Sequence, residues 1–152
     1  MGVIEDLGVT DAANMGAAMA PAAWSTVSAF FRDTGMSQDS FDLVLTGDLA
    51  SVGSELFREL AQREGVDISS KHNDCGMMLY DPDRQDVHAG GSGCGCCAAV
   101  LCGHILPLIR AGRLRNVLFA ATGALMSPTM SQQGETIPAI SHAVWISSDK
   151  NS

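Results

Sequence analysis

A run of small residues near the middle of the chain limits the fold more than any other feature. The stretch 88–97 has the sequence HAGGSGCGCC and leads directly into an apolar pattern of helical period. Residues with little or no side chain let two backbone segments, or a backbone and a ligand, approach closely. Free N–H groups at a helix start also favour an anion or an oxyanion. The stretch therefore predicts one wall of a small-molecule pocket, with His88 at its rim.

Hydropathy patterns and turn residues predict the other elements. Thr10 and Asp11 can cap a helix that begins at residue 12, and Pro21 is expected to interrupt it. Pro107 should kink the helix that the glycine-rich run opens. The remaining elements are expected, in chain order, as a helix at 21–33, a strand at 41–45, a helix from 51 or 54 to 63, an optional strand at 76–80, a helix at 93–111, a strand at 116–121 and a strand at 140–147.

This order of elements predicts an α/β fold with a mixed, mostly parallel sheet and helices packed on its faces. We expect one domain over 1–148 and a frayed tail at 149–152. The last two strands are separated by about 18 residues, a connection long enough to suggest a function. Its polar segment at 127–138 either closes over a pocket, contacts a membrane partner or is simply solvated.

Composition excludes several classes of partner. The formal net charge is −8, and the 152 residues include nine lysines and arginines. This disfavours nucleic acid and direct docking on an anionic membrane, because both need clustered positive charge. No apolar run reaches the roughly 20 residues of a membrane span, and the first residues do not resemble a signal peptide. With five cysteines that form no disulfide framework, we expect an intracellular protein with reduced thiols.

Several motifs taken together resemble the stage V sporulation protein AD family of the thiolase-like superfamily. The resemblance extends from Gly8 to Ile146, which is nearly the whole chain. Each motif alone is weak, but the set is specific. Besides HAGGSGCGC at 88–96, the motifs are MGAAMAPAA at 15–23, LTGDL at 45–49, ATGALMSP at 121–128, QQGE at 132–135, IP at 137–138 and HAV at 142–144.

The resemblance carries expectations about architecture. Thiolase-like proteins contain two similar halves, and this chain is similar to the C-terminal half alone. The N-terminal half, which holds the nucleophilic cysteine in active relatives, has no counterpart in the sequence. The resemblance therefore implies a half-domain whose partner is the missing N-terminal half or another copy of the chain. The surface that meets this partner should be a large apolar patch.

The resemblance also implies a function in sporulation. The family binds dipicolinic acid (pyridine-2,6-dicarboxylate), either free or as the calcium chelate, and assists its movement into the developing spore. The implied partners are membrane-embedded sporulation channel proteins, and the implied location is peripheral at the spore inner membrane. No cofactor is required, although calcium can arrive as part of the ligand. No resident metal site is expected.

The candidate ligand-binding residues follow from the motifs and the resemblance. His88 would donate an N–H to a carboxylate of the ligand, although it can instead cap the loop backbone. Asp48 is either a polar pocket group or a helix cap, and His142 is either a ligand contact or a core histidine on an apolar strand face. The backbone at Gly90, Gly91, Ser92 and Gly93 would assist His88, and Thr122 and Gly123 would form the pocket floor.

The alternative function is an acyltransferase or thiolase-type condensing enzyme acting on acyl thioesters. Condensation needs a nucleophile, a base and an oxyanion hole together. The segment 46–48 lacks the histidine or asparagine of active condensing enzymes, and the segment 122–124 lacks their second cysteine. At most the oxyanion part remains, with His88 as the candidate, so a non-catalytic binding function is favoured. Cys94 and Cys97 leave open a redox pair, and Cys94, Cys96, Cys97 and Cys102 a zinc site, with structural packing as the simpler explanation.

Overall fold

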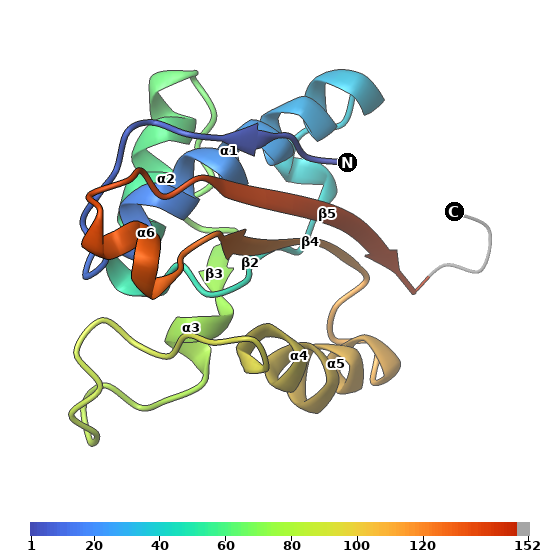
Figure 1. The fold of residues 1–152 in the computed structure, drawn as a ribbon. Helices are drawn as coiled ribbons and strands as arrows, with labels where there is room; N and C mark the ends of the chain where they lie inside the picture. Colours follow the sequence, from blue (N-terminus) through green and yellow to red (C-terminus); the bar gives the residue numbers. More distant parts are fainter. Residues whose placement is uncertain (149–152) are drawn as a thin grey trace.

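A five-stranded mixed sheet organises the computed structural model, which describes residues 1–148 (Figure 1). Its spatial order is β1-β5-β4-β2-β3. Strand β2 pairs in parallel with β3 and β4, whereas β5 is antiparallel to β4 and β1. The predicted α/β fold, with parallel strands at the sheet's core, is confirmed. The strands are β1 (Ile4–Glu5), β2 (Leu43–Thr46), β3 (His72–Asp74), β4 (Asn116–Ala124) and β5 (Ala139–Ser147).

Helices pack on both faces of the sheet, as Figure 1 shows. On one face, α1 (Met15–Thr34) and α2 (Ala50–Arg63) enclose a core that includes Leu118 and Ala120 of β4. On the other face, α4 (Cys96–Val100), η2 (Leu101–Ile105) and α5 (Leu106–Arg110) cover Val117 and Phe119. This alternation along β4 explains its almost continuous apolar sequence, because both of its faces are buried. The short elements are α3 (Cys75–Met78), α6 (Pro128–Gln132) and η1 (Gln38–Ser40).

Helix α1 is continuous through Pro21, so the predicted interruption there is wrong. The helix also begins later than predicted, after Asn14, whose side chain accepts a hydrogen bond from the Ala17 N–H. A proline inside a helix costs about 3 kcal/mol in an isolated helix. Here Ala20 and Ala22 on either side of it are fully buried, and this packing holds the helical backbone in place.

Two glycines let α1 and α2 cross at very short distance. A Cβ atom added to Gly16 would lie 2.8 Å from the Gly53 amide nitrogen, and one added to Gly53 would lie 3.0 Å from the Gly16 Cα. Such distances leave no room for any larger side chain. The close crossing brings α1 against the start of α2, next to the loop that follows β2.

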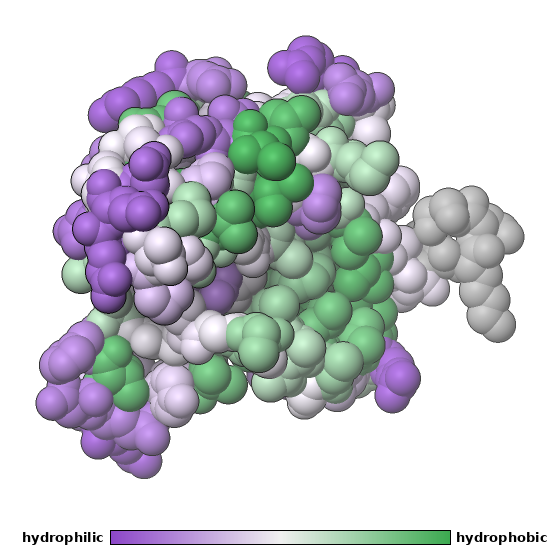
Figure 2. All heavy atoms as spheres, viewed as in Figure 1, coloured by the Kyte–Doolittle hydropathy of each residue, from purple (hydrophilic) through white to green (hydrophobic). Residues whose placement is uncertain are grey.

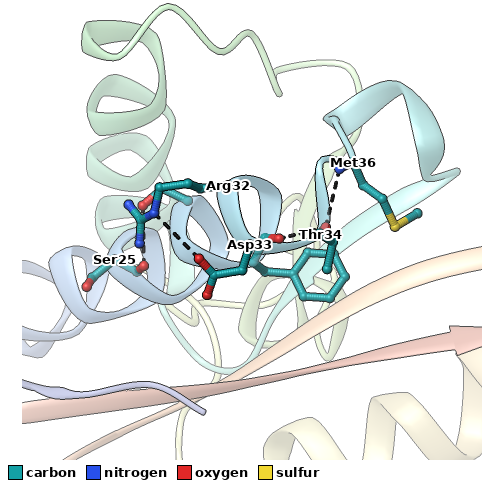
Figure 3. A network of polar contacts seen from close by, with 7 residues as sticks. Ser25, Arg32, Asp33, Thr34 and Met36 are labelled. Carbon is teal, nitrogen blue, oxygen red and sulfur yellow. Dashed lines mark hydrogen bonds and ion pairs between the residues drawn. The ribbon is translucent and has the colours of Figure 1, made fainter.

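The C-terminal end of α1 shows why this helix stops where it does (Figure 3). Gly35 adopts a left-handed conformation (φ 70°), and its N–H donates to the Phe31 carbonyl oxygen over 3.0 Å. The Thr34 hydroxyl donates to the Phe30 carbonyl oxygen over 2.7 Å and accepts from the Met36 N–H. These contacts satisfy carbonyl groups that lack partners within the helix.

Two other predicted elements differ in the structure. The segment 76–80 is not a strand, because Asp74 accepts a hydrogen bond from the Gly76 N–H and starts the single-turn helix α3. The neighbouring strand is β3, which begins four residues earlier than the sequence suggested. The helix expected at 93–111 is interrupted by the π-helical segment η2, which ends two residues before Pro107. A widened turn accommodates a residue that has no N–H to donate.

One face of β5 is left uncovered by the helices. Ile140, His142 and Val144 share this face with Gly123, Ala121 and Phe119 of β4 through the antiparallel register. Val144 is 53% exposed, because α4 and α5 pack mainly under β4 and β2 and contact β5 at Ile146, near its C-terminal end. His142 is exposed as well, so its interpretation as a core histidine is wrong. Its Nδ1 accepts a hydrogen bond from the Gly2 N–H at 3.2 Å.

No helix within residues 1–148 has the length and apolar character needed to cross a lipid bilayer.

Candidate functional site

The loops after the parallel strands β2 and β4 meet the glycine-rich segment at one edge of the sheet. Asp48 lies two residues beyond β2, and its carboxylate holds the site together. Its Oδ1 accepts a 2.8 Å hydrogen bond from Thr122 Oγ1 in the last third of β4. Its Oδ2 accepts from Ser92 Oγ at 3.0 Å and from the Gly93 N–H at 3.3 Å. Three segments distant in sequence are thus joined by one carboxylate.

Gly47 makes this meeting of strand ends possible. A Cβ atom at this position would lie 2.9 Å from the Thr122 amide nitrogen. The absence of a side chain lets the loop approach β4 closely enough for the Asp48 N–H to reach Thr122 Oγ1 at 3.4 Å.

A cavity of about 380 Å³ opens beside this cluster. Its volume falls in the range of small-molecule sites. No lysine or arginine is among the described residues that line it, and Asp48 is their one carboxylate. The lining residues are Met15, Met19, Asp48, Ser92, Gly93, Cys94, Cys97, Thr122, Gly123 and Ala124.

The structure brings together five of the nine residues that the sequence suggested for ligand binding. They are Asp48, Ser92, Gly93, Thr122 and Gly123, all of which line the cavity. The sequence did not indicate Met15 and Met19 as cavity residues, because methionines on a helix face are usually core filling. Their distance in sequence from the glycine-rich segment gives no signal that α1 borders the site.

His88 lies outside this cavity. Its side chain is 88% exposed, and its Nδ1 lies 3.2 Å from Asp86 Oδ1. The backbone at His88 adopts a φ of 48°, followed by a φ of 125° at Gly90. This turn places both residues on a separate hollow of about 90 Å³, which Tyr80 and Gly76 also border. The structure therefore places His88 at this hollow and not at the cavity beside Asp48.

Three N–H groups of the glycine-rich segment, those of Gly90, Gly91 and Gly93, are already engaged within the protein. The Gly90 N–H donates to the Val87 carbonyl oxygen, and the Gly91 N–H donates to the Gly76 carbonyl oxygen. The Gly93 N–H donates to Asp48. The helix itself begins three residues later than predicted, at Cys96, and α4 is short. These groups are not left free for an anionic ligand.

The cysteines near the cavity favour the thiol form where burial acts on them. Burial, followed by the charge of Asp48, raises the pKa of Cys97. The same causes raise the pKa of Cys96 to about 11. Cys94 is exposed at the cavity wall rather than packed in the core. A thiolate is the reactive species in redox chemistry, so the surroundings of Cys97 do not favour a redox pair with Cys94.

Within residues 1–148, no group of three or more histidine, cysteine, aspartate or glutamate side chains is placed to hold a metal ion.

Comparison with known proteins identifies the family. The model of the family described as "Stage V sporulation protein AD (SpoVAD)" matches residues 1–147. The chain is also 50% identical over 144 residues to stage V sporulation protein AD of Bacillus subtilis (strain 168), covering 95% of this chain and 42% of that protein. It thus spans about two fifths of the length of this relative. Because the match extends over almost the whole chain, the protein belongs to the stage V sporulation protein AD family.

Proposed function

We propose that this chain binds dipicolinic acid as its calcium chelate, in the cavity beside Asp48, and assists movement of the compound into the developing spore. Membership of the stage V sporulation protein AD family supports a role in sporulation. The observation that carries the proposal is the Asp48 carboxylate in a cavity without a lysine or arginine among its described lining residues. In this proposal the chain has a thiolase-like architecture, which serves as a non-catalytic scaffold for the site.

The hydrogen-bond pattern favours the chelate over the free dianion. The hydroxyl hydrogens of Ser92 and Thr122 point to Asp48, as does the Gly93 N–H. What the cluster offers to the cavity is therefore oxygen lone pairs and negative charge. A bare dicarboxylate would be repelled, since it needs donors. Calcium ions prefer oxygen ligands, carboxylates among them, so the metal edge of the chelate would face Asp48.

Calorimetry separates the two forms of the ligand. Dipicolinate is titrated into the chain with equimolar calcium chloride, or with excess EDTA, and calcium chloride alone serves as a third titrant. We expect binding in the first arm only. Asp48→Asn should weaken it at least tenfold, whereas Asp39→Asn, an exposed aspartate in η1, should leave it unchanged. No binding by the wild type, or equal affinity with and without calcium, would overturn the proposal.

The uncovered apolar face is proposed as the docking surface for the remaining part of the family protein. A groove of about 330 Å³ lies beside the cavity and shares Gly123 and Ala124 with it. Ile4 (70% exposed) and Leu125 (62% exposed) lie on its wall. Figure 2 shows hydrophobic side chains gathered over the side of the molecule that carries β5 and the helices α4 and α5. A segment that covers this groove would also close the ligand cavity.

Co-expression tests this partner. The part of the Bacillus subtilis relative outside the matched region is produced with this chain and analysed by native mass spectrometry. We expect a one-to-one complex that Val144→Asp disrupts and that Val52→Asp, an exposed apolar position on α2, leaves intact. Formation of a homodimer of this chain, with no complex, would assign the surface to a second copy and refute the proposed partner.

Passage across the membrane is assigned to other proteins. The described residues hold no helix that could span a bilayer, and the family is proposed to act with membrane-embedded sporulation channel proteins. In this proposal the chain is peripheral at the spore inner membrane and delivers the chelate to them.

A further inference from the structure

Asp74 is the most completely hydrogen-bonded buried carboxylate described in the structure. It lies at the end of β3 and is fully buried. Its Oδ2 accepts from Thr46 Oγ1 at 2.6 Å and from the Leu49 N–H at 3.0 Å. Its Oδ1 accepts from the Ala50 N–H at 2.9 Å and from the Gly76 N–H at 2.8 Å. Asp74 does not line the cavity, so these four bonds are not contacts to a ligand.

Two of these bonds fix the loop that carries Asp48. The Leu49 and Ala50 N–H groups directly follow Asp48 in the chain and open α2. Ala50 has a φ of 56°, in the left-handed region that a residue with a side chain rarely adopts. Such a conformation persists only where the surrounding contacts determine it. The bonds from the Leu49 and Ala50 N–H groups to Asp74 are contacts that hold this turn.

A third bond extends the influence of Asp74 to the glycine-rich segment. The Gly76 carbonyl oxygen accepts the Gly91 N–H at 2.8 Å, and the Ala89 carbonyl oxygen accepts the Ser51 N–H at 2.8 Å. A Cβ atom at Gly76 would lie 2.2 Å from the Gly91 carbonyl oxygen, so the two backbones are in direct contact. The next two residues of the segment, at 92 and 93, are those that bind Asp48.

We infer that Asp74 is the positioning residue of the site: it fixes Asp48 through the start of α2, and Ser92 and Gly93 through Gly76. The ligand assigned to that site rests on the proposed function, but the positioning can be measured without ligand. One carboxylate with four acceptor positions suits this task. An amide at the same place would offer a single acceptor oxygen, so either the Oδ1 pair or the Oδ2 pair of donors would lose its partner.

Amide hydrogen exchange of the full chain tests the positioning directly. In Asp74→Asn, we expect exchange at 49–51 and at 89–93 to accelerate together, at least tenfold. The matched control is Asp42→Asn, because Asp42 also accepts two backbone N–H groups, from Arg115 and Asn116, at the other end of β4. This control should leave both segments unchanged. Acceleration at 49–51 with unchanged exchange at 89–93 would overturn the inference.

Gly76→Ala provides a second variant if Asp74→Asn folds poorly. It keeps the carboxylate, and its added Cβ would lie 2.2 Å from the Gly91 carbonyl oxygen but 2.9 Å from Asp74 Oδ1. Exchange should therefore accelerate more at 89–93 than at 49–51. Greater acceleration at 49–51, or acceleration of neither segment, would contradict the assigned route through Gly76.

Calcium dipicolinate titrations then distinguish the inference from the proposed function. If the chelate binds, Asp74→Asn should weaken its affinity at least tenfold and should add little to the effect of Asp48→Asn in the double variant. Full additivity of the two substitutions would refute positioning through Asp48. Coupled exchange without any binding by the wild type would leave the positioning in place and refute the proposed ligand.

Discussion

Thr122 Oγ1 donates a 2.8 Å hydrogen bond to Asp48 Oδ1, which joins the ends of two parallel strands across 74 positions of sequence. The same carboxylate accepts hydrogen bonds from Ser92 Oγ and the Gly93 N–H, which belong to a third segment. The candidate site therefore depends on a single acceptor that orients two hydroxyl groups. Its chemistry follows from this orientation, because both hydroxyl hydrogens are directed to Asp48 and are not offered to a ligand.

Removing the Thr122 hydroxyl should affect ligand binding more than stability. Thr122→Val keeps the shape of the side chain but leaves Asp48 Oδ1 without this donor. We expect a loss of about 1 kcal/mol in binding, roughly fivefold in the affinity for calcium dipicolinate. The matched control is Thr136→Val, because Thr136 donates to Asp6 at 2.7 Å away from the cavity. Calorimetry of both variants checks this prediction. Equal affinities of Thr122→Val and Thr136→Val for calcium dipicolinate would contradict it.

The close crossing of α1 and α2 should not tolerate a methyl group. In Gly53→Ala the new Cβ would lie 2.9 Å from Leu49 Cβ and 3.0 Å from the Gly16 Cα. We expect destabilisation of about 1–3 kcal/mol, as for overpacked cores. Gly103→Ala is the control, since nothing lies within 4 Å of its Cβ position in the helical segment η2. That variant should be neutral or slightly stabilising in urea unfolding. If Gly53→Ala leaves the free energy of unfolding unchanged, α1 and α2 can move apart and the prediction is wrong.

His72 should make the protein less stable in mild acid. The ring is buried against Phe57, and its Nδ1 has no hydrogen-bond partner within the described residues. Burial, with a smaller contribution from the charge of Arg58, lowers the pKa of His72 to about 3. From pH 6.5 down to about 3, the unfolded state therefore binds a proton that the folded state does not. Stability should fall with pH by up to about 1.4 kcal/mol per unit.

A difference measurement isolates this effect from other groups. Burial raises the pKa of the neighbouring Asp74, which opposes the His72 effect because the folded state then takes up a proton first. Urea unfolding of the wild type and of His72→Gln should therefore be compared at each pH. The stability difference between them should shrink as the pH falls below 6.5. The exposed His104→Gln serves as control, and a pH-independent difference for His72→Gln would refute the prediction.

Asp42 should contribute stability at neutral pH that is lost in acid. Hydrogen bonds from the Asn116 and Arg115 N–H groups lower the pKa of Asp42. A lowered folded pKa means that the contribution is complete above the ordinary value of 3.8 and disappears as pH falls through the folded pKa. Because the carboxylate is exposed, we expect Asp42→Asn to cost less than about 1 kcal/mol at pH 7. Urea unfolding at pH 7 and below 3 checks this, with Asp39→Asn as control.

Local patterns in the sequence determined the fold class and most of the elements. The apolar strands at 43–46, 116–124 and 139–147 and the helix at 50–63 arise from periodicity and turn residues, which act over a few positions. The family followed from motifs along the chain. The prediction that Pro21 interrupts a helix was wrong because it considered only the local cost of a proline. The burial of Ala20 and Ala22, which offsets this cost, depends on tertiary packing.

The site itself was decided by the tertiary structure. The sequence suggested both Asp48 and His88 as ligand contacts, and the strand order β4-β2-β3 places Asp48, but not His88, at the cavity beside the ends of these strands. Two positive φ angles turned His88 and Gly90 onto a different hollow. No motif in the sequence distinguishes Asp74. Its positioning role is inferred from the folded structure, where donors from three segments converge on its carboxylate. Hydrogen bonds between residues far apart in the chain have no periodic signature, so only the folded backbone could reveal them.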